Sequence, residues 1–293
     1  MKHYLTLVVA IGAFHCAYAQ EPTLRETLFK ETDEALSAAQ AVDARLLSPN
    51  HFIDGAKAYL NAESDFERGR SLNRITGQLA SAIEAFTKAK EAAENASTSL
   101  ASPIQAREDA IAALAESFAV DLWNEAEELF SESAKNLETG NAEAATERAK
   151  KAESLYRDAE LEGIKAQHLS HTRSLIAQAE QIEVPQYAPK TFAKAKSLLA
   201  QAEAELNKNR YEVRLPGELT KQADYETRHA ELIANYIRGA ETEAWGVEDI
   251  ILLYEQSILE IAAAADKTLM LDKGSEPAAN EMVGYVRMLH DRE

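Results

Sequence analysis

A helix-forming phrase that recurs about every 70 residues constrains the fold more than any other feature of this sequence. The copies open at Ile53, Trp123 and Phe192, so they are 70 and 69 residues apart. In each copy a bulky residue, an alanine and a bulky pair stand at positions i, i+3, i+6 and i+7, which form one face of an α-helix. A face repeated at a fixed spacing predicts stacked, similar helical units.

Composition points to the same class of fold. The 293 residues include only 11 glycines and 7 prolines, and no run of alternating β-branched residues stands out. We therefore expect an all-α chain, an elongated array of long antiparallel helices with coiled-coil-like seams. The expected helical region is 20–273, with possible units at 49–102, 103–184 and 185–273, and a loop and short terminal helix follow at 274–293.

Two apolar seams carry this expectation. An alanine-rich seam begins at Ala145 and ends at Ala159 with steps of four and three residues, which predicts close packing of helix axes. A longer seam of the same steps runs from Ile233 to Ala265 and predicts one helix over 217–268. In that helix Ile251 and Ile258 are expected to be buried, so that replacing either with alanine would cost about 2–5 kcal/mol.

The N-terminus has the form of a secretory signal peptide at 1–19. A positive start at Lys2 is followed by a short apolar run, and Ala17-Tyr18-Ala19 forms a small-x-small cleavage site, so the mature chain is expected to begin at Gln20. The alternative is a buried N-terminal helix. Lipidation of Cys16 is not expected, because the residues before it do not form a lipobox.

Cleavage would remove the only cysteine, which excludes disulfides and thiol chemistry in the mature chain. It would also remove Lys2 and move the formal net charge from −18 to −19. Such acidity disfavours nucleic acids and anionic lipid surfaces as partners. The most apolar later run contains Glu255 and Glu260, so we do not expect an integral membrane protein.

Two spacings are candidates for a metal site. Glu226-x-x-His229 has the spacing found in carboxylate-bridged di-iron bundles, and His168 and His171 would share one helix face. The alternative is that these side chains face solvent and bind nothing. Because phosphate loops, nucleophile elbows and zinc-protease motifs are missing from the sequence, we expect neither an enzyme nor a cofactor.

Two stretches carry a resemblance to a known type of domain. They are Tyr187–Glu203, which contains Pro189 and Phe192, and Leu137–Ala152, which contains Gly140. Together they resemble the alanine-rich helical domain of unassigned function that precedes OmpA-like peptidoglycan-binding domains in Gram-negative envelope proteins. The resemblance covers about 118–240. It implies a periplasmic, outer-membrane-associated protein, but no OmpA-like motif is present to assign wall attachment to a residue.

A further similarity is to tetratricopeptide repeats, since 70 is close to twice 34, although their Gly-x-x-Tyr phrase is missing. The sequence thus predicts a non-enzymatic periplasmic scaffold or interaction spacer, with an envelope or peptidoglycan-associated partner. The alternative is a helical binding module that holds a small ligand or metal between helices, and an enzyme is the third class. The partner, the oligomeric state and any further C-terminal domain stay open.

Overall fold

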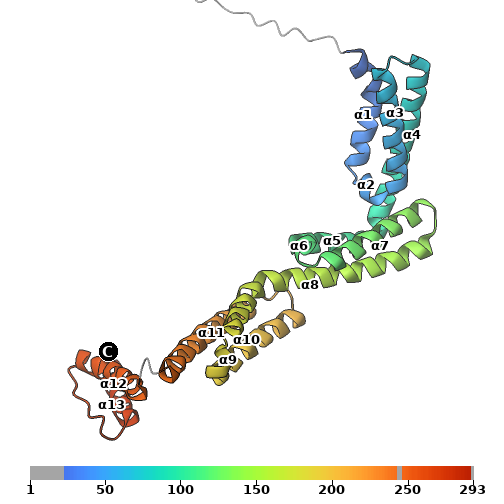
Figure 1. Cartoon of the computed structure of the whole chain (residues 1–293). Coiled ribbons are helices and arrows are strands. Elements are labelled where there is room, and N and C mark those ends of the chain that lie inside the picture. Colours follow the sequence, from blue (N-terminus) through green and yellow to red (C-terminus); the bar gives the residue numbers. More distant parts are fainter. Residues whose placement is uncertain (1–22, 243–245, 292–293) are drawn as a thin grey trace, which may run out of the picture. The chain divides into compact units, whose positions relative to one another are not determined.

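The computed structural model describes residues 23–242 and 246–291, which form thirteen α-helices and no β-strand (Figure 1). The prediction of an all-α chain is confirmed. The expected signal peptide, Cys16 and Trp245 lie outside the described residues. Within the described ranges the chain forms two compact units, and each is treated separately below.

The first unit contains Met1–Ile111 and Val120–Asp158. Its first helix begins with a capping box, in which the Glu26 backbone N–H donates to Thr23 Oγ1 and the Thr23 N–H donates to the Glu26 carboxylate at 2.6 Å. The helices of this unit are α1 (Leu24–Gln40), α2 (Ala44–Leu47), α3 (Pro49–Glu67), α4 (Leu72–Ser99), α5 (Ala101–Ala112), α7 (Val120–Glu138) and the first part of α8 (Ala142–Gln181).

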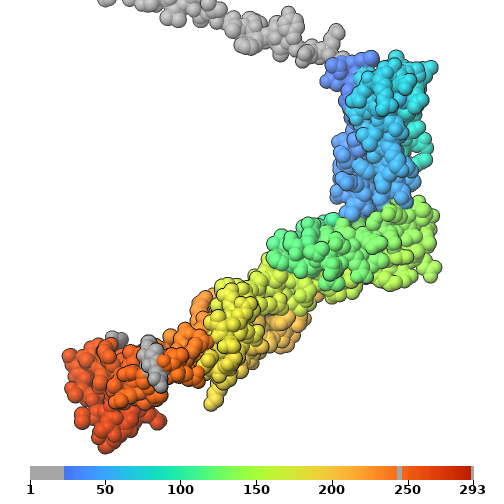
Figure 2. Space-filling model, in the orientation of Figure 1, coloured from blue at the N-terminus to red at the C-terminus, as the bar shows by residue number. Residues whose placement is uncertain are grey.

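Helices α1, α3 and α4 pack side by side, and their side chains fill the space between the ribbons (Figures 1 and 2). Phe29, Ile75 and Leu79 form one core cluster in which one residue of α1 meets two of α4. Further along, the ring of Phe86 lies against Phe52, with the ring centroids 5.6 Å apart. Gly55 lies under the same ring, where a β-carbon would be too close to it.

Helices α5, α7 and α8 supply the rest of the first unit. The predicted alanine seam is buried here, and Ala145 accepts a hydrogen bond from Ser133 Oγ at 2.7 Å through its backbone carbonyl. Small side chains on α8 let the helix axes approach this closely. The larger core residues here are Trp123, Phe130 and Tyr156, and the Tyr156 ring contacts the other two rings.

The second unit contains Ala112–Ala119 and Ala159–Glu293. One core cluster joins Ile176 of α8 to Phe192 and Ala230, and another joins Leu169 to Leu206. Its helices are α6 (Ala115–Phe118), the rest of α8, α9 (Val184–Tyr187), α10 (Pro189–Lys208), α11 (Arg214–Glu241), α12 (Val247–Ala264) and α13 (Ser275–His290).

The prediction of one helix over 217–268 is wrong. Helix α11 ends at Glu241, and α12 starts afresh after Gly246, whose backbone N–H donates to the Asp249 carboxylate at 2.8 Å. This carboxylate satisfies a backbone donor that a continuous helix would pair internally. The later seam residues are not buried as expected, since Ile251 is 53% exposed, and α13 begins at 275, where a short terminal helix was predicted.

Three one-turn helices share one backbone form. Helices α2, α6 and α9 each follow a residue with a left-handed conformation and end at a residue with φ between −126° and −144°. The residues at these ends are Ser48, Ala119 and Ala188, which are 71 and 69 residues apart. Phe52, rather than Ile53, therefore stands in the place equivalent to Trp123 and Phe192, so the sequence alignment of the first copy is one residue out of register.

Candidate functional site

The four candidate metal ligands do not converge. His171 Nε2 lies 3.6 Å from the Asp224 carboxylate, and His229 Nδ1 lies 4.0 Å from Glu226. Glu226 also forms an ion pair with Lys194, in which Nζ lies 2.6 Å from Oε1. His168 is exposed on α8. Across the described ranges no group of three or more His, Cys, Asp or Glu side chains is placed to hold a metal ion.

The most enclosed polar cluster of the first unit joins α5, α7 and α8. The Arg107 guanidinium donates to both carboxylate oxygens of Glu127, at 2.5 and 3.2 Å. The Tyr156 hydroxyl donates to the same carboxylate at 2.6 Å, and Arg107 lies 5.3 Å from the centre of the Trp123 ring. Glu128, the next residue of α7, is exposed.

The polar groups of this cluster are paired with one another. Burial, together with the hydrogen bond to Glu127, raises the pKa of Tyr156 far above its usual range, so the phenol stays protonated. Burial lowers the pKa of Arg107, but the hydrogen bonds and charge of Glu127, together with Tyr156, outweigh burial and hold this pKa above its usual value. A neutral phenol and a charged guanidinium on one carboxylate join the three helices.

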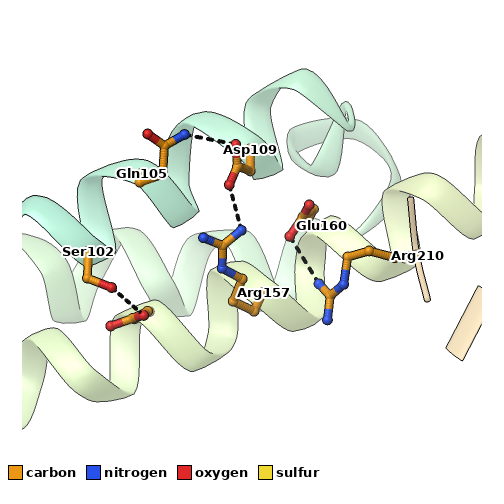
Figure 3. Close-up of polar contacts among 7 residues, drawn as sticks. Ser102, Gln105, Asp109, Arg157, Glu160 and Arg210 are labelled. Carbon is orange, nitrogen blue, oxygen red and sulfur yellow. Dashed lines mark hydrogen bonds and ion pairs between the residues drawn. The ribbon is translucent and has the colours of Figure 1, made fainter. Parts of the chain in front are cut away.

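Helix α8 carries polar side chains that reach other segments in both units (Figure 3). In the first unit Arg157 donates to Asp109 of α5 at 2.6 Å, and this hydrogen bond lowers the pKa of that carboxyl. Ser102 donates to Glu153 at 2.5 Å. In the second unit Arg210 donates to Glu160 at 3.0 Å. These contacts fix α8 against its neighbours.

A separate contact closes the start of α3. Its N-cap residue, Ser48, makes no side-chain cap bond to its own helix and instead donates from Oγ to Glu138 at 2.6 Å. The backbone N–H groups of Asn50 and His51 donate to the same carboxylate at 3.0 and 2.9 Å. A carboxylate at a helix N-terminus satisfies donors that have no partner within the helix. Glu138 belongs to α7, so it ties α3 to a helix far away in the sequence.

Replacing Glu138 with alanine is expected to reduce the free energy of unfolding by about 1–2 kcal/mol, because three donors lose their acceptor. Glu138→Gln retains an acceptor and should lose less. Urea unfolding followed by circular dichroism measures both. Glu125, which is exposed on the same helix, provides the matched control: Glu125→Ala should change stability by less than about 0.5 kcal/mol. Equal effects of Glu138→Ala and Glu125→Ala would show that the cap adds no stability.

The cavities of the first unit are shallow or small. Two cavities near Leu137 have volumes of about 190 Å³ each, below the range of about 300–1,000 Å³ of small-molecule sites. An open groove of about 640 Å³ is larger. Its lining residues are Gln40, Asp43, Arg45, Phe52, Ile53 and Ala56.

Among the described helices, none is both long enough and apolar enough to cross a membrane. Comparison with protein-family models, with curated proteins and with solved structures found no match to this chain.

Proposed function

We propose that this chain is a non-enzymatic scaffold of the bacterial cell envelope, exported to the periplasm, whose helical units present surfaces to other envelope or peptidoglycan-associated proteins. One observation carries the proposal: buried and partly buried carboxylates join one segment of the fold to another. Glu127 holds three helices together, Glu138 caps a helix from a distance, and Glu160 binds Arg210. Such contacts hold helices in a fixed arrangement, and a scaffold depends on a fixed arrangement of its surfaces.

The proposed export rests on the N-terminal sequence pattern and predicts where the chain is found. After fractionation of cells that express the full chain, the protein should be recovered from the periplasm or envelope, and N-terminal sequencing should begin at Gln20. Cleavage before Gln20 is expected because Ala17 and Ala19 fit the small-residue positions of a signal peptidase site. A chain that starts at Met1 in the cytoplasm, or that carries lipid on Cys16, would contradict the proposal.

A helical binding module is the second candidate, and the open groove beside Phe52 supports it. Arg45 and Asp43 give this groove charge, Phe52 and Ile53 give it apolar surface, and its volume of about 640 Å³ suits a small molecule. The small-molecule fraction of an envelope extract would then raise the melting temperature of the purified chain, and Ile53→Arg would abolish the rise. A scaffold without a ligand should show no rise in either protein.

A further inference from the structure

The α12–α13 pair exposes apolar side chains that have no cover among the described residues. The two helices and Leu269 of the loop between them pack together through a core of Leu269, Ala262, Ala278 and Met282. Leu252 is nevertheless 52% exposed and Leu289 is 43% exposed. Helix α12 is rich in large apolar residues, and a face of this kind is normally buried. We therefore expect a partner to cover this surface, and the packing of the earlier helices indicates what kind of partner fits.

The backbone places α12 in register with three earlier helices. Outside glycine, the described residues with positive φ are Asp43, Leu114, Glu183 and Asp266. Each follows the end of a helix by two or three residues. Four positions before each stands an alanine that is 0% exposed, namely Ala39, Ala110, Ala179 and Ala262. The end of α12 thus repeats the ends of α1, α5 and α8.

The same register continues into the following helix. Twelve positions after each positive-φ residue stands a small buried residue, and these are Gly55, Ala126, Ala195 and Ala278. Sixteen positions after it stands a bulky residue of the core, and these are Tyr59, Phe130, Leu199 and Met282. Helix α13 begins nine residues after Asp266, whereas α3, α7 and α10 begin six residues after theirs and follow a one-turn helix. Its buried positions nevertheless keep the same spacing, so α12–α13 corresponds to the first two helices of a group of three.

In each earlier group of three helices, a third helix covers the pair that corresponds to α12–α13. The third helices are α4, α8 and α11. Fourteen positions before the positive-φ residue, Phe29 packs on Ile75 and Leu79 of α4, and Leu169 packs near Leu219 of α11. Phe29, Leu100 and Leu169 are 0%, 2% and 0% exposed. Leu252 occupies the equivalent position and is half exposed. Leu289 is likewise equivalent to Leu206, which is 0% exposed. Leu252 and Leu289 therefore occupy positions that are buried where a third helix is present.

We propose that α12–α13 binds an amphipathic helix of another protein, which takes the place of the third helix. The third helices of this chain show the chemistry required. They have alanine-rich seams, such as Ala82, Ala89 and Ala93 of α4, and they direct arginines at carboxylates of the first two helices. Arg74 pairs with Asp65 of α3 at 2.6 Å, and Arg157 pairs with Asp109 of α5 at 2.6 Å.

Charge selects the occupant of this surface. Helix α12 carries four acidic residues and no Lys or Arg, so a partner helix with Lys or Arg beside its apolar seam would complement it. A second copy of α12 would bring carboxylates against carboxylates, and an anionic lipid surface would repel them. The proposal deepens the scaffold function proposed above by naming the class of partner. Its test uses purified protein, so a negative result would leave the envelope location untouched.

The test uses synthetic peptides with the sequences of two third helices, residues 72–99 and 214–241, added to the purified full chain. Fluorescence anisotropy should show saturable binding of at least one peptide. Leu252→Ser combined with Leu289→Ser should weaken this binding about tenfold or more, because two central apolar anchors are lost. The matched control is Leu60→Ser with Leu232→Ser. These leucines are 61% and 49% exposed but lie outside the shared register. Binding to the control should be unchanged.

Other results would overturn the proposal. Equal binding to both double variants would mean that a peptide displaces its own helix in the chain. Binding that survives Ala82→Asp and Ala89→Asp in the first peptide would be independent of the alanine seam. A concentration-dependent dimer in sedimentation that the leucine variant abolishes would assign the surface to a second copy. Flotation with phosphatidylglycerol vesicles would assign it to lipid. If neither peptide binds, the surface does not accept a third helix. Circular dichroism confirms that each variant remains folded.

Discussion

Replacing Phe130 with alanine is expected to reduce the free energy of unfolding by about 3–5 kcal/mol, which is the usual loss for a buried aromatic side chain. Phe130 is 0% exposed, and its ring centroid lies 6.2 Å from that of Tyr156. Helices α7 and α8 enclose the ring, so the cavity left by the substitution cannot collapse fully. Chemical denaturation of the purified chain measures the loss.

Ile251→Ala is the informative companion to Phe130→Ala. The sequence seam predicted a loss of about 2–5 kcal/mol at Ile251, but this side chain is 53% exposed. The structure therefore predicts a loss below about 1 kcal/mol in the isolated chain, because little apolar area leaves water there on folding. A loss as large as that at Phe130 would mean that this face of α12 is already buried in solution, by self-association or by a different fold of the C-terminal helices.

Replacing Gly163 with alanine is expected to reduce stability by about 1–3 kcal/mol through overpacking. A β-carbon at this position would overlap the backbone carbonyl oxygen of Ala113, which also accepts a 2.8 Å hydrogen bond from Gln167. A backbone atom cannot swing aside as a flexible side chain can, so the helix or the turn must shift. Gly163→Leu should lose still more. Thermal or urea unfolding of the variants measures the effect.

Gly77 supplies the opposite control. It lies in α4, and no atom outside its own stretch of helix comes within 4 Å of the place where a β-carbon would stand. Gly77→Ala should therefore raise stability by about 0.5–1 kcal/mol through helix propensity alone. Opposite signs at Gly77 and Gly163 would establish that the contact at Ala113 is as close as described. A gain in stability from both substitutions would contradict the close approach of Gly163 to the Ala113 carbonyl oxygen.

Some polar contacts of this chain can be predicted from local sequence, and others cannot. Thr23 and Glu26 are three positions apart, so a capping box between them is readable from the sequence. Glu138 and Ser48 are 90 positions apart, and the sequence around either residue does not predict contact with the other. Carboxylates are so frequent in this chain that no single one stands out before the helices are placed. The four candidate metal residues have the same limit: spacing along a helix does not fix which side chains face it.

The sequence by itself determined the helical class and the alanine seam, because each depends on local periodicity and on the scarcity of helix breakers. It placed Ala145 to Ala159 on a buried face correctly. It misjudged the seam around Ile251, because periodicity shows that a face is apolar and does not show what covers it. Only the tertiary structure decided that Asp266 resembles Asp43, that no third helix among the described residues covers Leu252 and Leu289, and that Glu138 caps α3. Those facts depend on backbone angles and on contacts between distant segments, which no local pattern encodes.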